Sequence, residues 1–359
     1  MLRAPFYDPL KSYEANYDEG PFNGFADGLD IREKGEPRFT FLGEKLHYPL
    51  GIPAGPILNA KYVDAAFKKG FDAVVYKTVR ADTFPCHPFP NVLSVKLDGA
   101  LTLERAKEPL VADAQYHEPL SITNSFGVPS KSADVWQSDA KRAIASEGKG
   151  QVMVMSFMGT VREGQSADEF VADFAKAARL ARETGARLYE ANLSCPNIGN
   201  EGLVCYQLDM TERVSAAIRA ELGDAPLILK VGYYQDQSQL EELARIAGKY
   251  AQAISSINTI AAPVVKDDGT QALPGSPVRL RSGVCGHAIK WAGLEMVKRL
   301  AEARAKLGAS FSIVGVGGVT NPADFKEYRE AGADLVMTAT GAMWNPLLAQ
   351  ETKAAYPDA

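Results

Sequence analysis

Six consecutive residues, Asn192-Leu193-Ser194-Cys195-Pro196-Asn197, place two carboxamides and one thiol directly after an apolar run typical of a β-strand. In parallel α/β folds, the loops that follow the strands carry the catalytic residues. Carboxamides can pair with the N–H and C=O groups of a planar amide or imide, and an ionised thiol can accept a proton. The alternative is a buried core cysteine beside turn-forming asparagines. The other strand ends favour the chemical interpretation.

Lysines lie within or at the end of two further apolar runs, at Lys77 and at Lys230. A lysine in a buried strand is costly unless its ammonium group meets an anion or an electron-rich acceptor. Either lysine alone is compatible with a solvated strand end. Two of them at the same edge of a sheet indicate a ligand.

Two later strand ends carry backbone suited to a phosphate group. One ends in Gly315-Val316-Gly317-Gly318, and the other in Thr338-Ala339-Thr340-Gly341. N–H groups at a glycine turn or at a helix N-terminus bind anions, and in barrels the loops after strands 7 and 8 commonly bind phosphate. The pair of loops predicts a phosphorylated cofactor or substrate.

A cation, a thiol and a phosphate site that face one space suit an oxidoreductase with flavin mononucleotide (FMN). A lysine beside the N1/O2 edge of flavin stabilises the anionic reduced form and favours hydride acceptance. Ala54-Gly55, the small residues after the first apolar run, would let a flat ring lie against the backbone. A non-redox phosphate-binding barrel, such as an isomerase or aldolase, is the alternative from another class.

The elements that must position these residues alternate regularly from residue 49 onward. Short, β-branched, nearly continuous apolar runs are separated by segments with helical periodicity, as expected for strands that are buried on both faces. Two of the helices have clear starts, at the capping box Ser166–Glu169 and at Asn321-Pro322. The alternation predicts a (βα)₈ TIM barrel rather than a doubly wound sheet. Its eight runs are 49–54, 72–77, 151–156, 187–193, 226–231, 254–258, 311–315 and 334–338.

The spacing of these runs also predicts how the chain is divided. Residues 49–359 form the barrel, and the region 78–150 is too long for one βα connection, so it holds an insertion after strand 2 with a hairpin at 92–105. Such insertions are commonly lids or substrate walls. Residues 1–48 are expected to be an extension that packs on the barrel or on a partner subunit.

Composition excludes several classes of partner. The net charge of −5 and the absence of a basic cluster argue against nucleic acid as a partner. No apolar stretch approaches the roughly 18–20 residues that span a bilayer. The 4 cysteines and 4 histidines are scattered, so neither a disulfide framework nor a metal site is expected. These features favour a cytoplasmic location.

Over residues 49–350 the chain resembles the dihydroorotate dehydrogenase family. The pieces that carry the resemblance follow the family's order, and the hexapeptide Asn192–Asn197 is its most specific motif. The others are Ala54-Gly55, Lys77, Asn124-Ser125-Phe126-Gly127, Lys230, Asn258-Thr259, Gly317-Gly318 and Thr340.

The resemblance implies a role for each matching residue. Cys195 would be the general base that removes a proton from C5 of dihydroorotate while C6 passes a hydride to flavin N5, and Lys230 would lie at the flavin N1/O2 edge. The substrate would be bound by Lys77, Asn124, Phe126, Gly127, Val128, Asn192, Asn197, Asn258 and Thr259. The FMN-binding residues would be Ala54, Gly55, Lys77, Thr78, Asn124, Asn192, Lys230, Ile257, Gly283, Val316, Gly317, Gly318, Ala339, Thr340 and Gly341.

With a Cys as the base, the chain resembles the soluble class of the family, since the membrane-bound class uses Ser. That class oxidises its flavin with fumarate, or with NAD through an iron–sulfur flavoprotein partner. This chain has neither a G-x-G-x-x-G fingerprint nor an iron–sulfur motif, so NAD would require a second subunit. We expect a homodimer, alone or with an electron-transfer subunit. Because Lys77-Thr78 and Gly202–Cys205 also resemble dihydropyrimidine dehydrogenase, which usually has His in place of Asn197, uracil or thymine chemistry is the alternative.

Overall fold

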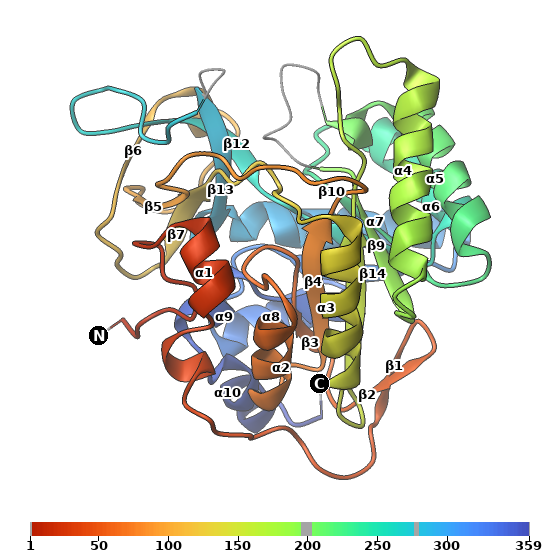
Figure 1. The fold of residues 1–359 in the computed structure, drawn as a ribbon, viewed down its shortest axis with the longest axis horizontal. Helices are drawn as coiled ribbons and strands as arrows, with labels where there is room; N and C mark the ends of the chain where they lie inside the picture. Colours follow the sequence, from red (N-terminus) through yellow and green to blue (C-terminus); the bar gives the residue numbers. More distant parts are fainter. Residues whose placement is uncertain (1, 195–202, 276–279, 359) are drawn as a thin grey trace.

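The computed structural model describes residues 2–194, 203–275 and 280–358. Eight parallel strands form a closed barrel in the order β10-β11-β14-β15-β3-β4-β8-β9 (Figure 1). The predicted (βα)₈ barrel is therefore confirmed, and each of the eight apolar runs overlaps one barrel strand. These strands are β3 (Leu50–Ile52), β4 (Ala73–Val79), β8 (Val152–Phe157), β9 (Leu188–Asn192), β10 (Leu227–Val231), β11 (Ala253–Ser256), β14 (Ser312–Val316) and β15 (Leu335–Met337).

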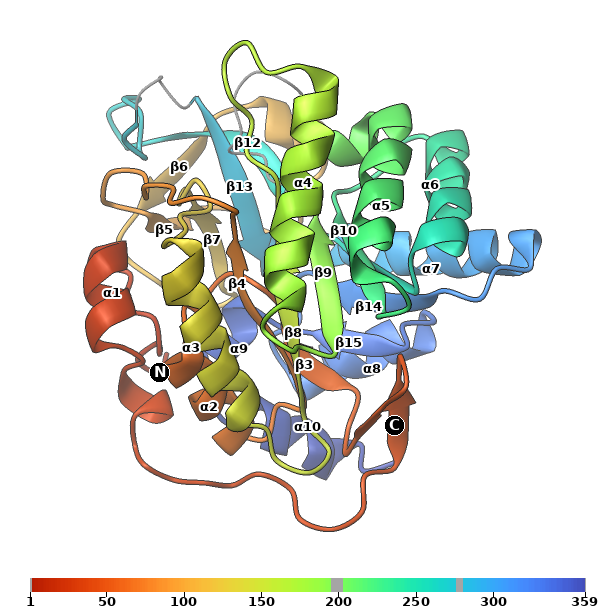
Figure 2. The ribbon, with the colours of Figure 1, turned by 45° about the vertical axis from the view of Figure 1, so that its right-hand side comes forward.

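Amphipathic helices cover the outside of the barrel, and α4, α5, α6 and α7 lie side by side along it (Figure 2). Both predicted helix starts are confirmed, since Ser166 and Asn321 each form a capping box and Pro322 follows Asn321 at the first helical position. The helices are α2 (Ala60–Lys68), α3 (Ala133–Ala145), α4 (Ala167–Arg182), α5 (Leu208–Leu222), α6 (Gln237–Tyr250), α7 (Lys290–Leu307), α8 (Pro322–Glu330), α9 (Thr340–Trp344) and α10 (Leu348–Ala355).

The barrel interior is apolar near the N-terminal ends of its strands. Val154, Leu188 and Ile228 belong to one buried cluster there. Phe41 and Leu46 belong to the same cluster, and they come from the hairpin of β1 (Phe39–Phe41) and β2 (Glu44–Leu46). This hairpin lies at the end of the barrel opposite the inserted strands described next (Figure 1). It therefore closes the bottom of the barrel with apolar side chains.

A second, smaller barrel of five strands, in the order β12-β13-β7-β5-β6, stands over the other end. Three of its strands follow β4 in the chain, and the remaining two follow β11, so two insertions build one unit. The sequence predicts only the first insertion, because β12 alternates buried and half-buried residues and lacks the continuous apolar run of a barrel strand. The strands are β5 (Val92–Val95), β6 (Leu110–Asp113), β7 (Ser121–Asn124), β12 (Ile260–Val265) and β13 (Arg281–Gly286).

The hairpin predicted at 92–105 is wrong in its extent. β5 pairs with β6, which begins at Leu110, and a 3-10 turn at Arg105–Lys107 lies between the two strands. The region 78–150 also contains α3, the barrel helix between β4 and β8, as well as the inserted strands.

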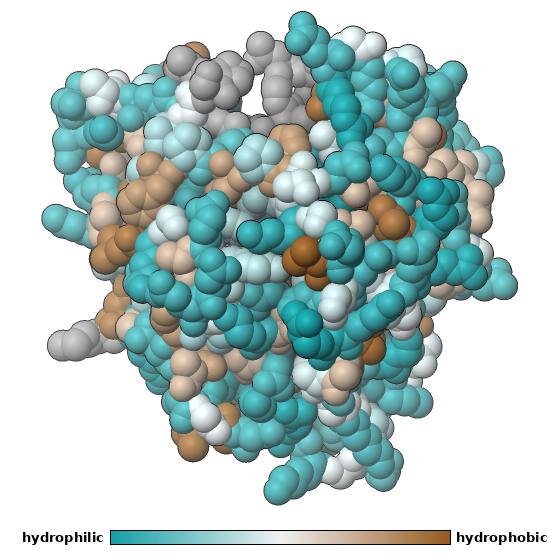
Figure 3. Space-filling model, in the orientation of Figure 1, coloured by the Kyte–Doolittle hydropathy of each residue, from teal (hydrophilic) through white to brown (hydrophobic). Residues whose placement is uncertain are grey.

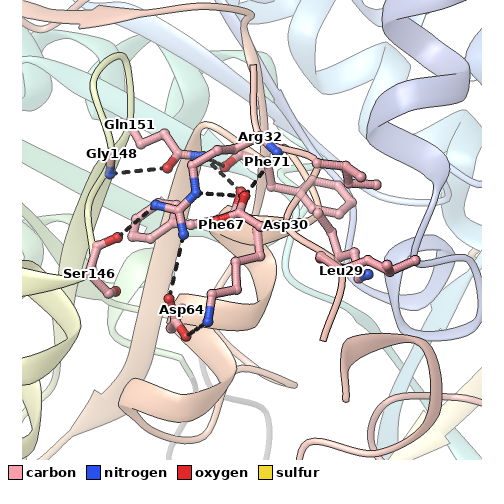
Figure 4. A network of polar contacts seen from close by, with 12 residues as sticks. Leu29, Asp30, Arg32, Asp64, Phe67, Phe71, Ser146, Gly148 and Gln151 are labelled. Atoms are coloured by element: carbon pink, nitrogen blue, oxygen red, sulfur yellow. Dashed lines mark hydrogen bonds and ion pairs between the residues drawn. The ribbon is translucent and has the colours of Figure 1, made fainter. Parts of the chain in front are cut away.

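The N-terminal segment lies against the barrel's helices. It contains α1 (Tyr13–Glu19) and a 3-10 turn at Asn23–Phe25. Farther along, Arg32 donates to the carbonyl oxygen of Ser146 (3.2 Å) and pairs with Asp30 (3.0 Å) and Asp64 (3.7 Å) (Figure 4). Because Asp64 is on α2 and Ser146 caps α3, this guanidinium ties the segment to two helices at once.

The face shown in Figure 3 is mostly hydrophilic, with hydrophobic residues scattered over it. The large exposed hydrophobic side chains, such as Leu10, Phe89 and Leu280, come from separate segments. Within the described ranges, no helix is both long and apolar enough to cross a membrane.

Candidate functional site

A cavity of about 1020 Å³, counted with its open mouth, lies between the C-terminal ends of the barrel strands and the inserted strands. Most of the residues predicted from the sequence to bind substrate or flavin come together there. They are Ala54, Gly55, Lys77, Thr78, Asn124, Phe126, Gly127, Val128, Asn192, Lys230, Asn258, Thr259, Gly283, Val316, Ala339 and Thr340.

Other predicted residues lie elsewhere. Ile257 is fully buried and, with Gly317 and Gly318, is not part of the cavity lining, whereas Gly341 lines a separate cavity beside Thr320 and Asn321. Cys195 and Asn197 fall outside the described residues, so their predicted roles have no geometry to support them.

A buried polar chain lies inside the barrel, next to the two lysines. Thr78 Oγ1 lies 2.9 Å from Ser156 Oγ, and Ser156 donates to Glu190 Oε1 at 2.9 Å. Burial raises the pKa of the Glu190 carboxyl, and the ammonium of Lys230 and the Ser156 hydroxyl act against that shift. Lys230 itself is 3% exposed, and its Nζ lies 3.4 Å from the carbonyl oxygen of Ala54. This places the cation on the cavity floor, beside the backbone that the flat ring is expected to contact.

The carboxamides come from three different elements. Asn192 ends β9, and its Oδ1 accepts the N–H of Ser194 at 3.1 Å. Asn258 donates from Nδ2 to the carbonyl oxygen of Ser194, so both side chains are fixed against the start of the same loop. Asn124 ends β7 in the small barrel and faces the cavity from the opposite side. Amide groups from both barrels therefore meet in one space.

The glycine loops after β14 and β15 have the backbone of an anion site. Gly317 and Gly318 have φ angles of 129° and 69°. A Cβ at position 318 would lie 2.6 Å from Cβ of Lys290, so only glycine fits. Among the residues that the structure describes, the backbone N–H groups of Gly317, Gly318 and Gly341 donate to no acceptor. These donors remain available for a phosphate.

Comparison with known proteins identifies the family to which this chain belongs. Residues 38–353 match the family model described as dihydroorotate dehydrogenase. The chain belongs to the dihydroorotate dehydrogenase family. This is a family of oxidoreductases, which rules out the non-redox barrel.

Relatives of this family differ in the oxidant that their names state. A "Dihydroorotate dehydrogenase" of Dictyostelium discoideum is 36% identical over 98% of this chain and 97% of its own length. A "Putative dihydroorotate dehydrogenase A (fumarate)" of Streptococcus agalactiae is 29% identical over 65% of this chain and 69% of its own. A "Dihydroorotate dehydrogenase (quinone)" of Thermobifida fusca is 27% identical over 86% and 75%.

The described cysteines differ sharply in their surroundings. Cys205, the thiol closest in sequence to the family hexapeptide, is fully buried away from the cavity, and burial raises its pKa to about 12. Cys285 lines the cavity, where its Sγ lies 3.7 Å from both Asn124 Nδ2 and Thr340 Oγ1. Burial raises the pKa of Cys285 too, against the opposing effects of Thr340, Asn124 and Lys230. Sequence reasoning missed Cys285, because only the antiparallel pairing of β13 with β7 brings it to the site.

Sequence reasoning also missed Tyr7, which the N-terminal segment contributes to the cavity. Its ring packs edge-on against Phe126 at 5.7 Å between centroids. Its hydroxyl is buried and has no hydrogen-bond partner in the described parts of the chain. No local pattern marks this tyrosine. The other lining residues missed are Val92, Ile122 and Met343, whereas Pro53 and Pro56 flank the predicted Ala54-Gly55.

Proposed function

We propose that this protein uses bound FMN to oxidise dihydroorotate to orotate, with Cys195 as the general base. The observation that carries the proposal is the convergence of two lysines, three asparagines and residues at the end of β14 and just after β15 (Val316, Ala339 and Thr340) on one cavity of a dihydroorotate dehydrogenase family barrel. When bound, FMN accepts the hydride that leaves C6 of the substrate.

The described residues fit FMN. The glycine loops hold backbone donors for its phosphate next to the lining residues Val316 and Thr340, and no dinucleotide fingerprint occurs in the sequence. A Cβ at Gly55 would meet nothing within 4 Å, so this side of the cavity is open to a flat ring. Thr259 Oγ1 is a buried atom of the lining with no partner in the described ranges, and a ligand would satisfy it.

Each polar side chain then has a physical task. Lys230, held at the floor, places positive charge beside the ring edge where negative charge develops. Asn124, Asn192 and Asn258 supply donors and acceptors to a planar pyrimidine, whose buried N–H and C=O groups must be paired. Lys77, on β4, supplies a cation for the substrate carboxylate. Two roles are assigned from the sequence alone: Cys195 removes the C5 proton, and Asn197 completes the set of carboxamides.

An anaerobic flavin-bleaching assay tests this function. The purified, reconstituted protein should hold FMN, and dihydroorotate should bleach its absorbance. FAD in its place, no flavin after reconstitution, or a flavin that dihydroorotate leaves oxidised would contradict the proposal. Re-oxidation by fumarate, quinone or NAD then identifies the acceptor.

We further propose a cytoplasmic homodimer, with an electron-transfer subunit only if NAD is the acceptor. The chain has no NAD fingerprint or iron–sulfur motif of its own. Re-oxidation by NAD without any second protein would contradict this assignment, and light scattering of the purified protein measures the oligomeric state.

A further inference from the structure

A buried arginine lies directly behind the loop that faces the substrate side of the cavity. Arg80 follows β4 immediately, three residues after Lys77, and is 2% exposed. Its Nε donates to the carbonyl oxygen of Val128 at 2.9 Å, and its Nη2 donates to that of Gly127 at 3.1 Å. One guanidinium thus holds two successive carbonyl groups.

The rest of the guanidinium is anchored to the barrel. Its Nη1 donates to the carbonyl oxygen of Gly159 and to Thr160 Oγ1, both at 3.1 Å. Its Cζ lies 4.0 Å from the centre of the Phe84 ring, which gives a cation–π contact. Because Gly159 and Thr160 follow β8, Arg80 joins a strand end of the large barrel to the inserted loop.

The turn that Arg80 holds is strained. Val128 has a φ of 53°, a left-handed conformation that is a true outlier for a β-branched residue. Gly127 has a φ of 76°, and a Cβ there would lie 2.1 Å from Nε2 of His87. Such strain persists only where surrounding contacts enforce it, and it is concentrated at ligand sites.

The hydrogen bonds to the carbonyl groups of this turn also set the direction of its backbone N–H groups. In a trans peptide the N–H points opposite to the C=O, so binding of the Gly127 carbonyl by Arg80 turns the Val128 N–H the other way. The Phe126 carbonyl accepts the N–H of His87 at 3.0 Å, which orients the Gly127 N–H by the same rule. Neither the Gly127 nor the Val128 N–H finds an acceptor in ranges 2–194, 203–275 and 280–358, and both residues line the cavity.

We infer that Arg80 is a positioning residue for substrate: its guanidinium enforces the left-handed Gly127–Val128 turn, so that backbone N–H groups are presented to the acceptor groups of the bound pyrimidine. This inference rests on the proposed function. Arg80 touches neither substrate nor flavin. Lysine cannot replace it, because a single ammonium cannot reproduce the planar fork that binds two carbonyls and the barrel together.

Arg80→Lys, compared with wild type as the FMN holoenzyme, tests the inference. Orotate titrated against flavin absorbance should bind roughly tenfold or more weakly, since two charge-assisted contacts to the turn are lost. The KM for dihydroorotate should rise while kcat and FMN content stay near wild type. Arg105→Lys is the matched control: Arg105 also donates to a carbonyl, that of Pro109, in the same insertion, but on an exposed surface away from the cavity.

Guanidinium rescue separates positioning from a general structural role. Arg80→Ala should regain orotate affinity when guanidinium chloride is added at a low, non-denaturing concentration, and should not regain it with sodium chloride at the same ionic strength. If the Arg80 variants do not fold, Thr160→Val removes one anchor of the fork and should weaken orotate binding roughly two- to fivefold.

The outcomes that would overturn the inference are distinct. The first is orotate binding by Arg80→Lys within twofold of wild type. The second is a loss of orotate affinity that follows the loss of flavin and is not rescued by guanidinium. If no Arg80 variant folds, the third is a Thr160→Val protein that binds orotate as tightly as wild type. A wild-type flavin that dihydroorotate leaves oxidised would instead overturn the proposed function.

Discussion

The two halves of the barrel interior use the same strands for opposite purposes. On β9, Leu188 lies in the apolar lower cluster, whereas Glu190, two residues on, belongs to the polar chain under the cavity. On β10, Ile228 and Lys230 make the same change. Since strand side chains alternate with a period of two, each pair points inward, only about 7 Å apart along the strand.

The difference shows that the lower half contributes mainly to stability, whereas the upper half gives up some stability to hold polar groups for chemistry. The lower half is closed by Phe41 and Leu46, which belong to an apolar cluster at its centre. The upper half buries a carboxyl and an ammonium group, and the described residues leave the hydroxyls of Ser255 and Thr259 without partners. Buried polar groups without a partner are destabilising, and Thr259 Oγ1, which lines the cavity, is one that a ligand would satisfy.

The largest expected effect at the upper end belongs to the general base. Cys195→Ser should keep FMN but slow its reduction by dihydroorotate by about 10²-fold or more at neutral pH, because a thiol with a pKa of ~8.5 ionises far more readily than an alcohol. The wild-type rate should rise with pH as the thiolate forms. Stopped-flow bleaching measures both.

Two other thiols are the controls for this test. Cys285→Ser changes the thiol that lines the cavity, and Cys205→Ser changes one whose pKa is raised to about 12 by burial. Both variants should reduce FMN close to the wild-type rate. A pH-independent wild-type rate with an unimpaired Cys195→Ser would remove Cys195 from the base role.

Exchanging residues on one strand tests the contrast between the halves directly. Lys230→Met should slow flavin reduction by about 10²-fold, because positive charge at the ring edge is lost in a water-poor site. Ile228→Val, two residues lower on β10, should cost about 1 kcal/mol of stability and leave the rate unchanged. Urea unfolding and stopped-flow bleaching of both variants give the comparison. Slower flavin reduction in Ile228→Val, or a wild-type rate in Lys230→Met, would contradict the contrast between the two halves.

A smaller effect is expected from one carboxamide of the inserted barrel. Asn124→Ala should leave buried polar groups of orotate unpaired, at ~1–3 kcal/mol, or roughly 5–150-fold in affinity. FMN should stay bound, since its phosphate donors lie on other strands. Titrating orotate and uracil against flavin absorbance measures this. Equal affinity of the wild type for the two would move the assignment to dihydropyrimidine chemistry.

The sequence predicts the barrel because each of its strands is a local apolar run, and it predicts Lys77, Lys230 and Asn192 because these polar residues lie in or at the end of such runs. Asn124 and Asn258 are expected from the family resemblance. It does not predict Cys285 or Tyr7, because each reaches the cavity through packing of distant segments. Nor does it predict the second insertion, whose strands alternate instead of running apolar. Local sequence patterns therefore predict the part of the site that the strands of the large barrel carry, whereas the part that the inserted strands carry depends on long-range pairing.

The smallest effect is expected at the lower end, and it concerns stability alone. Asp72 is fully buried just before β4, and Lys353 lies 3.0 Å from its Oδ2. Burial nevertheless raises the pKa of Asp72 to about 7, and Glu33 adds to the shift. The folded protein thus binds this proton more tightly than the unfolded chain, whose carboxyl has a pKa of ~3.9.

The sign of the pH dependence follows from that difference. A raised folded-state pKa adds stability below the unfolded value, and this stability is lost as pH rises toward about 7. Wild-type stability in urea should therefore fall between about pH 4 and pH 8, by at most a few kcal/mol at ~1.4 kcal/mol per pKa unit. Asp72→Asn, in which Lys353 keeps Glu33 at 3.2 Å, should flatten the profile. Its flavin reduction should match wild type at every pH, because Asp72 lies at the barrel end away from the cavity. A variant whose stability profile parallels wild type, or whose flavin reduction changes, would show that the two ends are not independent.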